Sequence, residues 1–548
     1  MADLNLGNMD GHRDELTKDI FILTRSVISF LDDKHSIISG PFGSGKSAIF
    51  NLLKNGSGLL KTYADDLVVT IDEQIQFQEL KNDSETFFPN LSERLKYQLL
   101  WKFQTCRRVS EEIAKLENFP VGENEEYLGE FLNRTGGQGG YLSVMARLKD
   151  LASKFSFKIN AKLSDVPVDV ELSKDSSKTT KRIELNLDAV IMHASRCIEK
   201  RGLRQATVII DKIDKFVAGE EYQTQRSYIE SLLQLEDDLY GEKKIRFKIF
   251  IRSDLYDRLD FSALGPDKAE DNTLRLVWSK EEIRSFLAKR IYNALAQRGV
   301  WDLDRIIESS DLSDYSLRWY ERRLLKDKTI GVSYIAAHIY SKLLGRKPNR
   351  RTLHEKVDLT VIGKLFFPEL LHECPDGKKK SISYQDFLDT HFLDGNNSCT
   401  PRYMLVFLKE LFEEANNYYL KSPNVIVTPV LHGGDWVYKL LTPELVYGAY
   451  LKAKEKYIRH IAKVDDKWAQ NIAELLGKKS NKKTFDYKWI RNNITFVGDA
   501  NDQALSFLIY LQVIGFFKVR KFDVDIRKRL FELPILYSSA SGAVEHDI

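Results

Sequence analysis

A glycine-rich run that ends in lysine and serine lies near the N-terminus, between a short apolar segment and an apolar-rich stretch. Residues 40–47, Gly-Pro-Phe-Gly-Ser-Gly-Lys-Ser, satisfy G-x-x-x-x-G-K-[ST] at every defined position. Glycines let the backbone curl so that its N–H groups converge on phosphates, and a following helix adds partial positive charge. In this chemistry Lys46 neutralises the β- and γ-phosphates, and the Ser47 hydroxyl ligates Mg²⁺. The motif therefore predicts a site for ATP and Mg²⁺.

We expect the nucleotide to contact the loop and the start of the helix that follows it. The expected contact residues are Gly40, Pro41, Phe42, Gly43, Ser44, Gly45, Lys46, Ser47 and Ala48. The alternative is a glycine-rich turn after a strand, without a ligand. The apolar segment before the loop and the helix-forming segment after it favour the phosphate site.

A second apolar segment ends in an acidic residue. Residues 206–211, Ala-Thr-Val-Ile-Ile-Asp, predict a strand buried on both faces, with Asp211 holding Mg²⁺ through water opposite Ser47. A core strand ending at a turn is the alternative. Many P-loop ATPases place a second acid directly after this aspartate, but here Lys212 follows. Asp214 is then the nearest carboxylate for a general base, and we expect slow hydrolysis.

A third strand is predicted over residues 246–252 and ends in Arg252. At the carboxyl edge of a parallel sheet this arginine could sense the γ-phosphate. An ion pair with Asp254 or Asp257 is the alternative. Two further segments, 66–71 and 273–277, complete an expected five-stranded parallel core.

The segment between residues 71 and 206 is too long for a simple crossover between strands, and it predicts an insertion. Apolar residues at helical spacing predict helices over 92–115 and 125–133. Two alternating runs, 155–163 and 166–172, predict a β-hairpin.

The length and composition predict several soluble domains. A chain of 548 residues is too long for one hydrophobic core, and its net charge of +3 favours no particular partner. The four cysteines are scattered and lack metal-ligand spacing, which is typical of incidental thiols. Because the sequence has neither a membrane-spanning apolar run nor a leader-like N-terminus, we expect a cytoplasmic protein without a membrane partner.

The segment after the core predicts a helical lid. Residues 279–290 form a capped amphipathic helix with Ser279 at its N-cap and Glu282 three residues on. Arg290 and Arg402 are candidates for a lid arginine that contacts the nucleotide. Solvated cations at helix ends are the alternative for both.

The last part of the chain predicts a winged-helix-like module. A helix over 503–515 ends at glycine and is followed by extended segments at 516–522 and 530–537, with a further helix at 466–476 upstream. Basic residues flank this region: Lys478, Lys479, Lys482, Lys483, Lys518, Arg520, Lys521, Arg527, Lys528 and Arg529. They would suit the phosphates of a nucleic acid, but a docking surface for a protein and a solvated face remain alternatives.

Four motifs in their order along the chain resemble a known group. Residues 40–47, residues 208–211 with Asp214, residues 250–254 and residues 276–290 look like the signatures of bacterial P-loop ATPases of the STAND/KAP-like, AAA-related group. Many members act in antiviral defence. The resemblance covers about residues 20–290 and implies an ATP-dependent switch coupled to homo-oligomerisation. The sequence has no recognisable nuclease, protease, deaminase or NADase motif, so we expect any effector activity to reside in a partner protein. Lys212 departs from the group's pattern, which usually has an acid there.

We therefore expect an α/β protein with a parallel-sheet P-loop NTPase core. The predicted parts are a core over 1–278 with an insertion at about 80–200, a helical lid over 279–345, a helical connector over 346–425 and a winged-helix-like α+β module over 426–548. The expected function is a slow, Mg²⁺-dependent P-loop ATPase acting as a molecular switch in bacterial antiphage defence. Two alternatives remain: a nucleic-acid-binding loader resembling origin-recognition ATPases, and a scaffold that binds nucleotide without cleaving it.

Overall fold

The chain divides into two compact units, residues 25–277 and residues 1–24 with 278–548. The computed structural model describes residues 14, 21–22, 24–56, 62–71, 88, 90–116, 122–135, 156–163, 166–172, 182–213, 222–240, 244–261, 265–298, 367–368, 370–373, 379–421, 429–432, 435–438, 441–462, 466–478 and 484–538. The first unit contains the glycine-rich loop.

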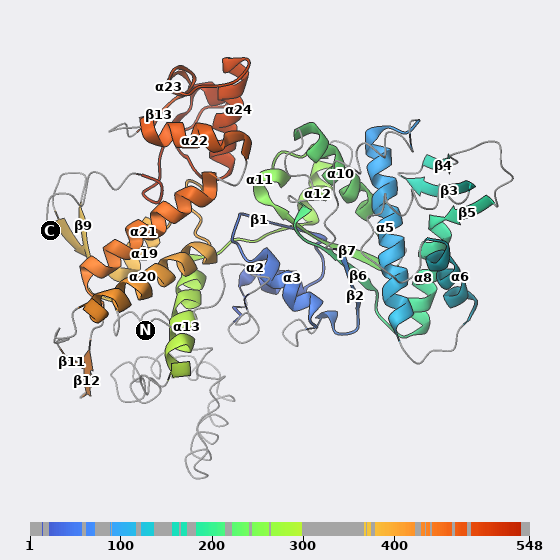
Figure 1. The fold of residues 1–548 in the computed structure, drawn as a ribbon, viewed down its shortest axis with the longest axis horizontal. Coiled ribbons are helices and arrows are strands. Elements are labelled where there is room, and N and C mark those ends of the chain that lie inside the picture. Colours follow the sequence, from blue (N-terminus) through green and yellow to red (C-terminus); the bar gives the residue numbers. More distant parts are fainter. Residues whose placement is uncertain are drawn as a thin grey trace, which may run out of the picture. The chain divides into compact units, whose positions relative to one another are not determined.

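A parallel β-sheet forms the centre of the first unit (Figure 1). Among the described residues it has five strands: β1 (Ile37–Gly40), β2 (Leu67–Ile71), β6 (Ala206–Ile210), β7 (Ile245–Arg252) and β8 (Thr273–Arg275). Their order is β2-β6-β7-β1-β8, and every neighbouring pair is parallel. The expected five-stranded parallel core is therefore confirmed.

Apolar residues on both faces of the sheet explain why its strands read as continuous hydrophobic runs. On one face, Phe250 of β7 packs against Phe30 of α2 (Arg25–Leu31) and Phe50 of α3 (Lys46–Lys54), with ring centroids 6.4 and 6.2 Å apart. On the other face, Ile249 and its alternate neighbours join a core shared with α5 (Glu93–Lys115) and α10 (Tyr222–Leu239). Figure 1 shows α2 and α3 on one side of the sheet and α10 on the other. The short helices α11 (Ser253–Tyr256) and α12 (Pro266–Asp271) precede β8.

The insertion contributes α5 to the core against the sheet and adds further helices and a small sheet beside that helix. Its predicted helices are confirmed as α5 and α6 (Glu123–Arg134), and its predicted hairpin as the antiparallel pair β3 (Ser156–Leu163) and β4 (Val166–Leu172). Two elements were not predicted, β5 (Arg182–Asn186), which runs parallel to β3, and α8 (Leu187–Lys200). Five residues give too short a strand signal, whereas buried residues at helical spacing from Val190 to Ile198 could have indicated α8.

The second unit begins with α13 (Lys280–Arg298), whose N-terminus carries the predicted capping box: Ser279 N–H donates to Glu282, and Glu282 N–H donates to Ser279 Oγ. Most of the predicted lid and connector, residues 299–366, lies outside the described residues. The elements that follow are hairpin β9–β10 (Leu370–Glu373, Lys379–Ile382), α19 (Tyr384–His391), α20 (Pro401–Lys421), hairpin β11–β12 (Pro429–His432, Asp435–Tyr438) and α21 (Pro443–Ala462). The four-part division of the chain stays a prediction.

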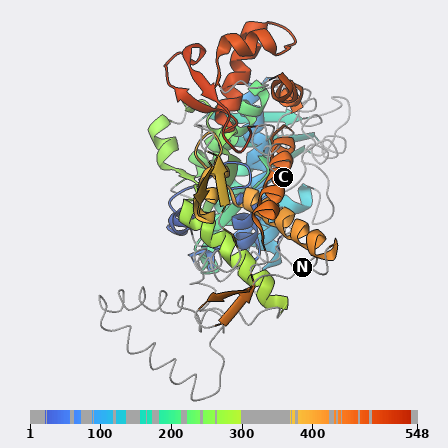
Figure 2. The same cartoon turned by 90° about the vertical axis from the view of Figure 1, so that its left-hand side faces the viewer.

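The C-terminal segment combines three helices with a small antiparallel sheet. In chain order it contains α22 (Asp466–Lys478), β13 (Thr484–Phe485), α23 (Tyr487–Asn493), α24 (Ala500–Val513), β14 (Lys518–Lys521), the 3₁₀ turn η3 (Ile526–Lys528) and β15 (Leu530–Glu532). The sheet order is β13-β15-β14, and Figure 2 shows its strands in red beside the red helix. The predicted helix and the two strands after it are present, but the strands are shorter than expected. β13 and α23 were not predicted.

The structure bears on the expectations about membrane-spanning segments and about the cysteines. None of the described helices is long and apolar enough to cross a membrane. Cys106, Cys197 and Cys399 are buried free thiols, and Cys374 lies outside the described residues.

Candidate functional site

The glycine-rich loop connects β1 to α3 at the carboxyl edge of the parallel sheet. Gly43 and Gly45 have φ angles of 84° and 101°, a left-handed conformation that favours glycine over other residues. A Cβ atom on Gly40 would lie 2.5 Å from Ser44 Oγ and 3.1 Å from Leu276 Cβ, so a side chain there would displace at least the Ser44 hydroxyl. The spacing of the glycines is therefore explained by backbone conformation and by close packing within the loop.

The lysine of the motif turns back over the loop that precedes it. Lys46 Nζ donates hydrogen bonds to the carbonyl oxygens of Gly40, at 2.5 Å, and Pro41, at 2.9 Å. Lys46 is also the first residue of α3, and its N-cap, Gly45, makes no side-chain capping bond. The ammonium group and the positive end of the helix therefore lie at the same loop.

The serine of the motif contacts the predicted metal-binding aspartate. Ser47 Oγ donates to Asp211 Oδ2 at 2.8 Å, across 164 residues of sequence. Asp211 is buried, with 5% of its surface exposed, and its other oxygen, Oδ1, accepts the N–H of Lys212 at 2.8 Å. The predicted pair of residues is brought together because β1 and β6 both end at this edge of the sheet, although β7 lies between them.

Lys212 has an unusual backbone conformation. Its φ angle is 63°, in the left-handed region that costs a non-glycine residue about 1–2 kcal/mol. Such strain is found most often at functional sites. Asp214, the predicted general base, lies outside the described residues.

Arg252 lies beside the loop and is held by an acidic neighbour. In the β1–β7 register it is opposite Gly40. Its guanidinium makes two bonds to Asp254, Nε to Oδ1 at 2.9 Å and Nη2 to Oδ2 at 2.6 Å. Asp257, the other acid considered, pairs instead with Arg275 at 3.0 Å. The ion-pair alternative therefore describes the observed geometry, and the γ-phosphate role stays a prediction.

The two candidate lid arginines lie in the second unit. Arg290 is buried, with 4% of its surface exposed, and its guanidinium pairs with Asp14 at 2.5 Å, so it is no solvated helix-end cation. Arg402 lies in the first turn of α20 and is half-buried. A contact of either residue with nucleotide stays a prediction.

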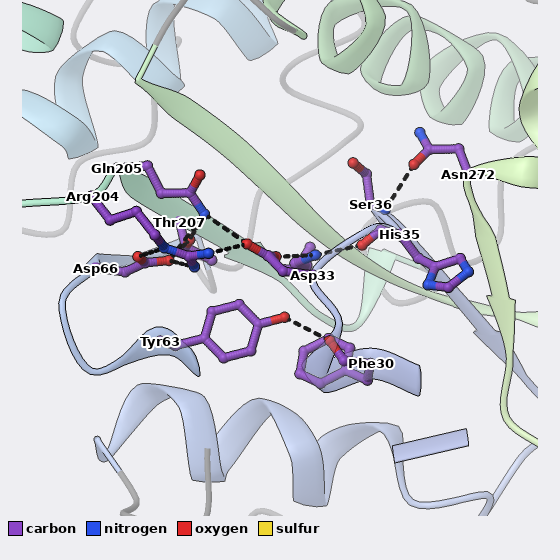
Figure 3. A network of polar contacts seen from close by, with 11 residues as sticks. Phe30, Asp33, His35, Ser36, Tyr63, Asp66, Arg204, Gln205, Thr207 and Asn272 are labelled. Carbon is purple, nitrogen blue, oxygen red and sulfur yellow. Dashed lines mark hydrogen bonds and ion pairs between the residues drawn. The ribbon is translucent and has the colours of Figure 1, made fainter. Parts of the chain in front are cut away.

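A buried polar network at the opposite edge of the sheet was missed by sequence reasoning (Figure 3). Arg204 makes two bonds to Asp66, at 2.6 and 2.7 Å, and one to Asp33, at 2.6 Å. Lys248 Nζ forms an ion pair with Asp33 at 2.7 Å and donates to the His35 carbonyl. A signal was present, because Asp66 directly precedes β2 and Arg204 stands two residues before β6, its neighbour in the sheet. The network links the starts of β1, β2 and β6 to β7.

The electrostatics of this network follow from burial and opposite charges. Burial raises the pKa of Asp33, but the ammonium of Lys248 and the guanidinium of Arg204 outweigh it and hold the pKa below the usual value. Burial lowers the pKa of Lys248, and Asp33 opposes that effect. Pairing within the network thus offsets part of the cost of burying these charges.

The fold and site define an α/β protein with a parallel sheet and a glycine-rich loop facing a buried aspartate. No protein-family model matches the chain, and no curated protein is significantly similar to it.

Proposed function

We propose that the chain is a P-loop ATPase that binds ATP with Mg²⁺, hydrolyses it slowly and acts as a molecular switch. The observation that carries this proposal is the 2.8 Å bond between Ser47 Oγ and Asp211 Oδ2 at the mouth of the glycine-rich loop. A glycine-rich turn without a ligand would not require a buried aspartate from another strand to meet its serine.

The residues present suit both groups that the site would hold. Magnesium prefers oxygen ligands, and Ser47 and Asp211 offer a hydroxyl and a carboxylate within hydrogen-bond distance of each other. When bound, Mg²⁺ bridges phosphate oxygens and neutralises their developing charge. Lys46 supplies a further positive charge, and a triphosphate would compete with the carbonyls of Gly40 and Pro41 for its ammonium group.

Slow hydrolysis is supported by Lys212. A protonated lysine directly after Asp211 is no general base, so the proposal assigns that role to Asp214, two residues further on. Arg252 would have to leave Asp254 to reach a γ-phosphate, which couples the nucleotide to the start of α11.

The second unit supports a switch with a separate interaction module. The order α22, β13, α23, α24, β14, β15, with β15 between the other two strands, suits a winged-helix-like module. We propose that ATP binding promotes homo-oligomerisation and that the assembly engages a partner effector protein in antiphage defence. This last part rests on the resemblance of the four motifs alone.

Nucleotide binding tests the proposal directly. Lys46→Ala should reduce ATP affinity by at least about 100-fold, because a charge-assisted contact to phosphate is lost in a partly buried site. Lys54→Ala, which removes an exposed lysine at the other end of α3, is the matched control and should bind like wild type. Equilibrium titration with a fluorescent ATP analogue gives both affinities. Equal affinity of the Lys46→Ala variant and wild type would refute the proposed site.

The loader-type alternative makes a different prediction for turnover. Radiolabelled ATP hydrolysis should be stimulated by DNA in a loader and unaffected in a switch that responds to a protein. A scaffold would bind ATP in the titration above and show no turnover under either condition.

A further inference from the structure

The hairpin between β14 and β15 concentrates charge. Residues 518–532 contain six cations and three carboxylates, so this short segment has a net charge of +3, equal to that of the whole chain. Some of these cations lie close to a carboxylate. Arg520 pairs with Glu532 at 3.2 Å, and Lys518 lies opposite Glu532 in the strand register. Arg520 and Lys518 therefore both lie near the Glu532 carboxylate, and Arg520 is paired with it.

The exposed cations lie nearer the hairpin tip. Lys521, Arg527 and Lys528 are all exposed. The guanidinium of Arg527 lies 6.0 Å from the ring centre of Tyr487, which places η3 beside α23 and its exposed Lys488. A positive surface thus extends from the hairpin tip toward α23.

Two large apolar side chains stand at the same tip. Phe522 is 70% exposed and Val524 is 90% exposed. The guanidinium of Arg529 lies 4.5 Å from the ring centre of Phe522. Arg529 also donates to the Asp523 carbonyl at 2.7 Å and to Gln512 Oε1 at 2.9 Å, which ties the tip to α24. The Phe522 ring therefore lies next to the Arg529 guanidinium, which is fixed by its own hydrogen bonds.

The two acidic residues of the hairpin tip accept hydrogen bonds from its backbone N–H groups. Asp523 Oδ1 accepts the N–H of Asp525 at 2.9 Å, and Asp525 Oδ1 accepts the N–H of Arg527 at 3.0 Å. These bonds fix the turn from within, so Phe522 is held exposed by a structured loop. An aromatic ring backed by arginine and flanked by cations suits an unpaired base next to its phosphates.

The neighbouring helix does not suit the major groove of a duplex. α24 contains neither lysine nor arginine, and its exposed positions include Asn501, Asp502, Ser506 and Ile509. Its N-cap is a further carboxylate, Asp499. Base recognition by this helix would bring negative charge toward phosphates.

From these contacts we infer that the β14–β15 hairpin binds single-stranded nucleic acid, with Phe522 stacking on a base and Lys521, Arg527 and Lys528 contacting phosphates. The inference rests on the hairpin alone and requires no nucleotide in the glycine-rich loop. Binding should show little sequence preference, because every base has a face on which a ring can stack.

The test uses the full chain without ATP. Labelled random DNA of about 30 nucleotides, as single strand and as duplex, is titrated with the protein and followed by fluorescence anisotropy. The titrations are repeated from low to moderate salt. The single strand should bind more tightly. Replacing Lys521, Arg527 and Lys528 by alanine should reduce the slope of log affinity against log salt by about 2, since each phosphate contact contributes about 0.7 on a single strand. Phe522→Ala should weaken binding about tenfold at an unchanged salt slope, whereas Phe522→Trp should retain binding.

The matched control replaces three exposed cations of α21, Lys452, Lys456 and Arg459, by alanine and should leave binding unchanged. Absence of binding at low salt would overturn the inference. So would equal binding of duplex and single strand with no effect of Phe522→Ala, or binding to phosphatidylserine vesicles in place of the oligonucleotides. Because ATP is omitted, failure here is independent of the Lys46→Ala result.

Discussion

At the residue scale, the proposed site combines side chains that suit ATP and Mg²⁺ with a lysine at the position where an acid is expected. Ser47 and Asp211 meet directly, and Lys46 lies over the loop. Lys212 stands where a catalytic acid would be expected, in a left-handed conformation that costs free energy.

We predict that Lys212→Glu increases ATP turnover about tenfold or more, because it places a carboxylate next to Asp211. The backbone strain is similar for glutamate and lysine, so the folded state should be retained. If Asp214 is the base of the wild-type chain, Asp214→Asn should reduce turnover by about 100-fold, and adding Lys212→Glu to it should restore activity. Steady-state phosphate release gives the turnover of wild type, the two single variants and the double variant. Unchanged turnover in both single variants would place the base elsewhere.

At the element scale, the parallel sheet is held from its amino edge by the network around Arg204. Asp66 has a fully buried side chain, and Arg204, Gln205 and Thr207 all donate to it. These contacts connect the starts of β2 and β6, which are far apart in the sequence.

Arg204→Ala should therefore destabilise the first unit. The Arg204 side chain is 37% exposed, and Gln205 and Thr207 still donate to Asp66 after the change. We therefore expect a loss of about 2 kcal/mol, less than the 3–5 kcal/mol typical of a fully buried pair. Lys200→Ala removes a 42% exposed side chain whose ammonium lies 3.4 Å from Glu125, and it should change stability by less than about 1 kcal/mol. Urea unfolding compares the variants. Similar losses in both would mean that Asp66 is solvated after the change.

Backbone contacts also join the loop after α19 to the end of α24. Gly395 N–H donates to the Gly515 carbonyl at 2.6 Å, and a Cβ atom on Gly395 would lie 2.2 Å from the Phe517 oxygen. Asp394 lies in this joint, where burial raises its pKa to about 7 although two backbone N–H groups donate to it.

Stability should depend on pH through Asp394. Because its folded pKa lies above the usual 3.8, its contribution is complete below pH 3.8 and is lost as the pH rises through about 7. Asp394→Asn does not ionise and retains an oxygen for the two N–H donors. Its free energy of unfolding, relative to wild type, should rise by about 2.7 kcal/mol between pH 5 and pH 8.5, from two pH units at about 1.36 kcal/mol each. Urea unfolding at both pH values measures this, and a difference that is independent of pH would contradict it.

At the scale of the whole molecule, the proposal combines a site for ATP in the first unit with a C-terminal module suited to a second ligand. The proposed switch requires that the nucleotide favours one assembly state over another, and only a difference in affinity between the two states achieves this. The subunit count is thus the most informative global quantity.

We predict that wild-type protein increases in molar mass on adding ATP and Mg²⁺, measured by size-exclusion chromatography with light scattering. Lys46→Ala should retain its nucleotide-free mass, since it lacks the binding energy that shifts the equilibrium. An identical wild-type mass with and without ATP would exclude nucleotide-driven oligomerisation while leaving nucleotide binding intact.

The sequence by itself determined the elements whose signals are local. The glycine-rich loop, the five core strands and the insertion's hairpin were predictable because spacing, apolar runs and alternation act over a few residues. The same local signals indicated a helix followed by a strand pair near the C-terminus.

Only the tertiary structure decided which distant residues meet. The strand order places β7 between β1 and β6 yet brings Ser47 to Asp211, and no local pattern specifies that order. The pairing of Arg252 with Asp254 and the network around Arg204 likewise arise from packing. So does the exposure of Phe522 beside a helix without cations. These features depend on contacts between segments far apart in the chain, whose free energy is gained only after the sheet has formed.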